Sequence, residues 1–79
     1  ERAISEVKVY PTSTQDLLYL SGLGNGGTIQ IISMEGKSLM TQECSQDNAT
    51  LNIEQLPNGY YLCAITLSNI TKTIPIIKY

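Results

Sequence analysis

Short runs of alternating apolar and polar residues, separated by turn residues, extend along the whole chain. In the clearest of them, "ATLNIEQ", Ala49, Leu51 and Ile53 alternate with polar residues, as in a strand with one buried face. No window of 11 residues keeps a helical period. The runs predict seven strands, at about residues 7–10, 17–20, 28–33, 38–44, 49–55, 60–68 and 72–78.

Two of these strands carry further information. The longest follows Asn58-Gly59, which we expect to form a tight turn, and a second turn is expected at Glu35-Gly36. In the last strand Pro75 cannot donate a ladder hydrogen bond, so this strand is expected at a sheet edge. The longest strand should place four side chains on each face, with Tyr61, Cys63, Ile65 and Leu67 on one and Tyr60, Leu62, Ala64 and Thr66 on the other.

Seven short strands in 79 residues favour an all-β fold, a compact immunoglobulin-like antiparallel β-sandwich. Linker composition and internal repeats are absent, so residues 1–79 are expected to form one domain. The chain starts at Glu1 without Met, and we expect it to be a fragment of a longer protein.

The composition excludes several classes of function. A net charge of −2, with 15% charged residues, provides no clustered Lys and Arg for nucleic acid. No apolar run reaches the length of a membrane span. The chain has no histidine, which removes the usual general base and nucleophilic sites that depend on it. The acidic residues lie far apart in sequence, so we expect no catalytic residues, no metal and no cofactor.

Three motifs are interpreted as coincidental. "GLGNGG" matches a dinucleotide-binding pattern through Gly22, Gly24 and Gly27, but a strand follows it where that fingerprint needs a helix. We interpret it as a flexible hairpin loop. The triplets "NAT" and "NIT" match the glycosylation sequon at bends, and they carry little weight.

The cysteines and tyrosines leave alternatives open. Cys44 and Cys63 allow one disulfide, but two buried free thiols are the preferred interpretation. The tyrosines could form a platform for stacking sugars, which needs coplanar exposed rings. Tyr61 is instead expected in the core, and four others lie on different strands: Tyr10, Tyr19, Tyr60 and Tyr79.

The order of strands and turns resembles the C-terminal sorting domain of proteins exported by the bacterial type IX (Por) secretion system, from about Val7 to Lys78. In "VYPTSTQDLLYL", Tyr10 and Pro11 match the first motif of that family, although a second proline and an asparagine are missing. "IQIISMEGK" matches a later motif through Gly36 and Lys37.

Two further motifs carry the resemblance. The most specific is Leu-Pro-x-Gly-x-Tyr followed by an apolar strand, which "LPNGYYLCAI" supplies through Leu56, Pro57, Gly59 and Tyr61. The terminal strand "TKTIPIIKY" matches through four residues: Lys72, Ile74, Ile76 and Lys78.

The resemblance implies a noncatalytic sorting signal. Such a domain travels with its parent protein through the periplasm and is bound by the type IX outer-membrane translocon. A sorting and attachment peptidase usually removes it and joins the parent protein to a surface lipopolysaccharide. The parent protein would then be at the cell surface or secreted. No small-molecule substrate is expected.

The motif residues also have structural roles. Leu56 can close the end of the core, and the Tyr61 hydroxyl can bind nearby backbone, as corner tyrosines do in sandwiches. We hypothesise that the terminal hairpin, residues 60–79, is the recognised part, with Lys72 and Lys78 beside an apolar pair on an edge that accepts a partner strand. These lysines could equally protect the edge from aggregation, and an open edge would also allow a homodimer. The alternatives to a sorting signal are a small extracellular carbohydrate- or protein-binding module and an inert spacer.

Overall fold

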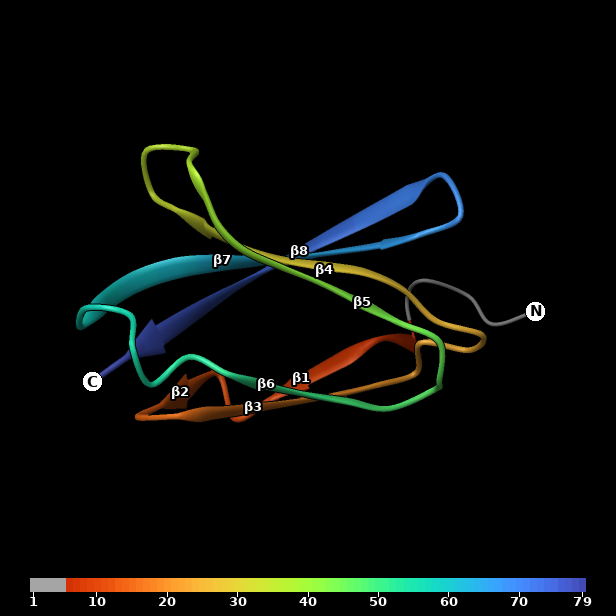
Figure 1. The fold of residues 1–79 in the computed structure, drawn as a ribbon, viewed down its shortest axis with the longest axis horizontal. Helices are drawn as coiled ribbons and strands as arrows, with labels where there is room; N and C mark the ends of the chain where they lie inside the picture. Colours follow the sequence, from red (N-terminus) through yellow and green to blue (C-terminus); the bar gives the residue numbers. More distant parts are fainter. Residues whose placement is uncertain (1–5) are drawn as a thin grey trace.

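A computed structural model describes residues 6–79, which form two β-sheets stacked face to face (Figure 1). One sheet has three strands in the order β1 (Lys8–Tyr10), β3 (Leu17–Ser21) and β6 (Ala49–Asn52). The other has five in the order β2 (Ser13–Thr14), β8 (Ile70–Lys78), β7 (Gly59–Leu67), β4 (Gly27–Ser33) and β5 (Ser38–Cys44). The predicted all-β sandwich is confirmed.

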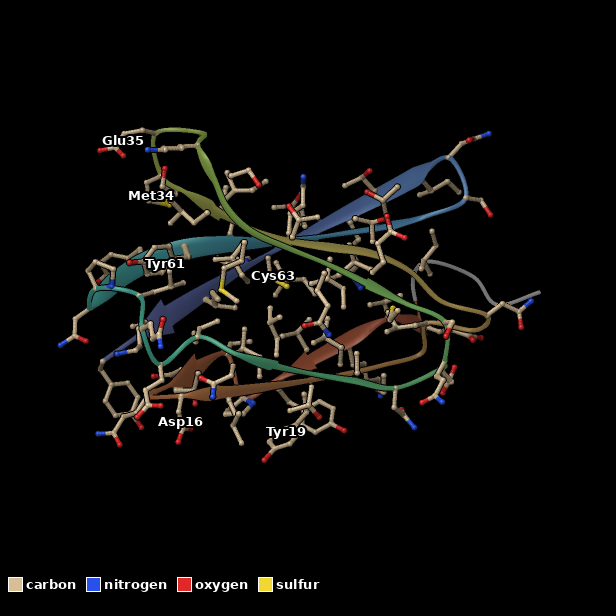
Figure 2. The ribbon with its side chains drawn as sticks, viewed as in Figure 1. Asp16, Tyr19, Met34, Glu35, Tyr61 and Cys63 are labelled. Atoms are coloured by element: carbon tan, nitrogen blue, oxygen red, sulfur yellow. The ribbon has the colours of Figure 1, made fainter. Side chains whose placement is uncertain are left out.

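The core lies between the sheets and follows the period-two pattern of the sequence. β3 buries Leu18 and Leu20 and exposes Tyr19 between them. On β7 the predicted inward face is confirmed, and Figure 2 shows Cys63 between the two layers. The fully buried large side chains are Val7, Leu18, Leu20, Leu23, Ile29, Ile31, Leu51, Ile53, Cys63, Ile65 and Ile76.

Residues 6–79 contain one strand more than predicted, and the additional strand is β2. β2 is only two residues long. β2 pairs with β8 in parallel, with Ser13 opposite Ile77 and Thr14 opposite Lys78. The five-stranded sheet is therefore mixed, and the prediction of a wholly antiparallel sandwich is wrong at this edge. Two residues are too few to show an alternating pattern, so the sequence carried no signal for β2.

The chain crosses between the sheets after β3, because β3 and β4 belong to different sheets. The glycine-rich loop at 22–26 is therefore a crossover, and its interpretation as a hairpin is wrong. It is also held in place, since the backbone N–H of Leu23 donates to the Asp47 carbonyl at 2.9 Å and that of Gly24 to Asp47 Oδ1 at 2.9 Å. A strand follows it, as expected.

β8 is an edge strand over most of its length but not at its end. Residues 70–76 pair with β7 only, whereas Ile77 and Lys78 also pair with β2. The prediction from Pro75 is therefore correct for the first part of β8 and wrong for the last residues. In Figure 1 the C-terminus lies beside the loop that leads into β7.

Candidate functional site

The segment 56–61 forms the corner where the chain crosses from β6 to β7. The N–H of Leu56 donates to the Ile53 carbonyl at 3.0 Å, which closes the turn, and the Leu56 side chain packs against the core. Asn58 lies in a bend, and Gly59 is already the first residue of β7. The chain therefore turns at 53–56, and the predicted tight turn at Asn58-Gly59 is wrong. Leu56 does close the end of the core, as predicted.

Tyr61 fastens this corner to the start of β7. Its ring is 7% exposed and belongs to the core cluster, while its hydroxyl donates a hydrogen bond to the Pro57 carbonyl. The predicted corner tyrosine is thus confirmed. The Tyr61 ring packs in the core, and its hydroxyl holds the backbone four residues upstream.

The C-terminal end of β8 meets this corner. Lys78 lies opposite Gly59 in the β7–β8 ladder, and its Nζ donates to Asn58 Oδ1 at 3.2 Å. The Lys78 side chain is 9% exposed, and the acceptor that holds its ammonium is a neutral amide. The Lys78 ammonium therefore sits against the corner. We use "corner site" for segment 56–61 together with Lys78.

The segment that follows Pro11 fixes the same end of β8 from the other side. The Ile77 N–H donates to the Thr12 carbonyl at 2.8 Å, and the Tyr79 N–H donates to the Thr14 carbonyl at 3.1 Å. Residues separated by more than 60 positions in the sequence are therefore joined next to the corner site.

The β4–β5 hairpin lies at this end of the sandwich as well, because Ser33 at the end of β4 is opposite Tyr61. Glu35 and Gly36 lie in its turn, as predicted. The Gly36 N–H donates to the Ser33 carbonyl at 2.9 Å, and Gly36 has a φ of +91° that favours glycine. Lys37 is exposed and closes the loop, since its N–H donates to Ser33 Oγ at 3.1 Å.

The four β8 residues singled out from the sequence lie on the inward face of the strand. Ile76 is 1% exposed in the core and Ile74 is partly buried against it. Lys72 lies opposite Ile65, far along β8 from Lys78, and its Nζ donates to the Val7 carbonyl at 3.1 Å. The structure therefore separates the two lysines and does not place them as a pair on an exposed edge.

The exposed face of β8 carries residues that sequence reasoning did not select: Thr71, Thr73, Pro75 and Ile77. The alternation along the strand separates the two sets, but it does not say which set faces the core. The pairing partners identify the buried face of β8, since Ile74 and Ile76 are opposite the buried Cys63 and Tyr61.

Tyr10 and Tyr19 are partners across β1 and β3, and their exposed rings stack with centroids 5.9 Å apart and planes at 27°. Tyr19 points outward from the three-stranded sheet in Figure 2. The rings face one another and do not lie side by side in one plane.

Both cysteines are free thiols, as preferred, but only Cys63 is buried, and the prediction of burial is wrong for Cys44, which is partly exposed. Burial raises the pKa of the Cys63 thiol to about 11, so it stays neutral near pH 7. The Cys44 thiol donates to the Gly27 carbonyl at 3.5 Å. Within residues 6–79 no three or more His, Cys, Asp or Glu side chains gather as a metal site would require. The same part of the chain has no helix capable of spanning a membrane.

Residues 8–79 match the family described as the secretion system C-terminal sorting domain. The chain belongs to this family. No curated protein matches it.

The match confirms the resemblance to the type IX secretion sorting domains over nearly the whole chain. A sorting domain of this kind implies export across the outer membrane to the cell surface or the medium, and interaction with the type IX machinery. The family is one of sorting signals and is not known as catalytic.

Proposed function

We propose that the sorting domain carries its parent protein through the periplasm to the type IX outer-membrane translocon, and that the corner site is the part the machinery recognises. The observation that supports this proposal is the Lys78–Asn58 hydrogen bond. It joins the Leu-Pro-x-Gly-x-Tyr segment to the terminal strand, and the two bonded residues are 20 positions apart in sequence. Because Lys78 is held by a neutral amide, its charge is available to an acidic group of a partner.

The remaining motif residues support this arrangement in different ways. Ile74 and Ile76 hold β8 against the core, and Lys72 ties β8 to the backbone at Val7. Pro11 precedes the segment that fastens the end of β8. We therefore assign Ile74, Ile76 and Pro11 to the display of the corner site and Lys72 to the anchoring of the far end of β8, while Leu56, Pro57, Gly59, Tyr61 and Lys78 form the site.

The fate of the domain follows the usual course of the family. We propose that residues 1–79 form a single domain at the C-terminal end of a longer protein. A sorting and attachment peptidase removes the domain after export and replaces it with a surface lipopolysaccharide anchor.

An export assay tests the proposal. Residues 1–79 are fused behind a signal peptide and a fluorescent reporter that folds in the periplasm, in a bacterium with a type IX system. The intact fusion should deliver the reporter to the surface or the medium. Reporter retained in the periplasm by the intact, folded fusion would refute the sorting function.

A lysine variant tests the corner site itself. Lys78→Met keeps most of the buried stem and removes the ammonium. Because Asn58 is exposed and water can replace the lost donor, the free energy of unfolding should change by less than about 1 kcal/mol. Export should be lost. Lys72→Met is the matched control, and it should still be exported. Normal export of Lys78→Met would contradict the role of this charge.

A carbohydrate-binding module is the second candidate function, and the Tyr10–Tyr19 stack is the observation that would support it. However, each ring already covers one face of the other, so the pair lacks the side-by-side platform expected for sugar stacking. Tyrosine fluorescence that changes on titration with glycans, and no longer does so in Tyr19→Ala, would favour this function over sorting.

A further inference from the structure

The two outer edges of the five-stranded sheet differ in what they offer to an added strand. On β8 the N–H groups of Ile77 and Tyr79 point away from β7, since they donate to Thr12 and Thr14. Backbone direction alternates along a strand, so Thr71, Thr73 and Pro75 also present their backbone outward. Pro75 has no N–H, and β2 covers the strand beyond it. The free edge of β8 is thus interrupted by Pro75 and covered by β2 at its end.

The direction of the β5 backbone follows from the same alternation. The Ser33 N–H donates to the Lys37 carbonyl at 2.8 Å, which sets the pattern at the hairpin end of β4. Following the register from β8 through β7 and β4 gives the same result. The even-numbered residues Met40, Gln42 and Cys44 therefore bond to β4, while Thr41 and Glu43 present their N–H and C=O groups outward.

The outer edge of β5 has no proline and no covering strand. β5 spans seven residues without proline, and Glu43 is its one charged residue. Within residues 6–79 no strand pairs with its outer side. The irregularity at Ile31/Ile32 affects only the hairpin end, so residues 40–44 pair regularly with β4. Natural proteins blunt a sheet edge with a proline, charged side chains, a bulge or a covering segment, and of these β5 has only Glu43 and the irregularity at its hairpin end.

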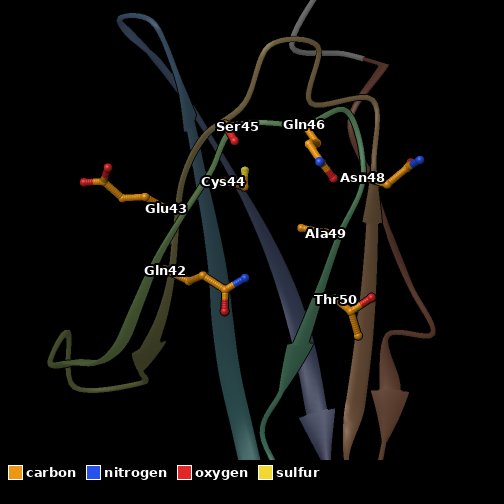
Figure 3. A pocket seen from close by; sticks show the side chains of 8 residues that line it. All are labelled: Gln42, Glu43, Cys44, Ser45, Gln46, Asn48, Ala49 and Thr50. Carbon is orange, nitrogen blue, oxygen red and sulfur yellow. The ribbon is translucent and has the colours of Figure 1, made fainter.

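A polar cleft of roughly 420 Å³ lies beside this edge, between β5 and β6. Figure 3 shows Gln42 and Cys44 along one wall, Ala49 on the other, and Glu43 pointing away. The amides of Gln42, Gln46 and Asn48 line it. Amides both donate and accept hydrogen bonds, so they suit the polar side chains and backbone of a peptide.

We propose that β5 is the docking edge for an extended segment of the type IX machinery, which adds as a further strand beside Thr41 and Glu43. Alternate side chains of that segment enter the cleft, and those on the other face lie near Glu43. A basic residue opposite Glu43 would be favoured, because opposite charges on paired strands attract. The inference rests on the proposed sorting function and assigns it a second contact, distinct from the corner site.

Thr41→Pro tests this docking edge. The substitution removes an outward N–H and costs no bond to β4, so the purified domain should keep its fold and a Tm close to that of the unchanged domain. In the export assay, the amount of reporter at the surface should fall about tenfold or more. A tenfold fall corresponds to a loss of about 1.4 kcal/mol in the free energy of binding to the partner segment. Thr73→Pro makes the same change on β8, and it should be exported normally.

A second variant covers the case in which Thr41→Pro lowers the Tm strongly. Lysine is tolerated in a strand, so Glu43→Lys should keep the fold while it reverses the charge at the edge. It should also reduce the amount of reporter at the surface. Normal export of a folded Thr41→Pro, or of Glu43→Lys, would overturn the docking edge and leave the sorting function intact. Failure of the unsubstituted fusion to leave the periplasm would instead refute the sorting function itself.

Light scattering on purified residues 1–79 separates the two possible occupants of the edge. A monomer agrees with a strand supplied by the machinery. A dimer that Thr41→Pro dissociates would show that the edge accepts a second copy of the chain, and it would overturn the assignment to the machinery.

Discussion

The hydroxyl of Tyr61 is a single group whose removal tests how the corner site is held together. In Tyr61→Phe the ring stays in the core, and only the hydrogen bond to the Pro57 carbonyl is lost. A typical buried hydrogen bond contributes about 1 kcal/mol. Pro57 is exposed, so water can satisfy its carbonyl and the loss should not exceed this value. For a domain of this size the Tm should fall by about 4–8 °C.

Tyr60→Phe is the matched control for this prediction. Tyr60 is the neighbouring residue, 68% exposed on the opposite face of β7, and its hydroxyl has no hydrogen-bond partner in the described part of the chain. Its removal should change the free energy of unfolding by less than about 0.5 kcal/mol. Thermal unfolding followed by circular dichroism measures both variants. Equal Tm values for Tyr61→Phe and Tyr60→Phe would refute the idea that the hydroxyl fastens the corner.

Two further predictions concern the core. Leu18→Ala, at a position that is 0% exposed, should cost about 2–5 kcal/mol in urea unfolding, whereas Leu39→Ala at the exposed hairpin end should cost less than about 0.5 kcal/mol. Burial raises the Cys63 pKa from 9.0 to about 11, so the stability that it contributes is complete below pH 9.0 and is lost as the pH rises through about 11. Between these two pH values the free energy of unfolding should fall by up to about 3 kcal/mol more in the unchanged domain than in Cys63→Ala. Equal changes in the free energy of unfolding of the two proteins with pH would contradict this prediction.

The sequence predicted the strands well because most long strands have one face in the core. In such a strand the alternation of apolar and polar residues follows the alternation of buried and exposed side chains, as in β3 and β7. β2 escaped detection because it is two residues long and exists through its pairing with β8. The loop at 22–26 was misread for a related reason: its glycines indicate a turn, but not whether the chain stays in one sheet or crosses to the other.

The sequence also identified the corner and the end of β8, since Leu56, Tyr61 and Lys78 belong to motifs in a fixed order. It did not show that Lys78 meets Asn58, or that Lys72 lies far from both. Contacts of that kind depend on the register between strands, which no local pattern specifies.

The sequence by itself thus determined the fold class, the family and the period of every long strand, because these depend on residues that are close together in the chain. Only the tertiary structure decided which face of β8 is buried, which sheet edge is free and which lysine reaches the corner. Those features depend on how two sheets stack and on pairings such as Thr12 with Ile77. Their partners lie far apart along the chain, so they come together only when the sandwich closes.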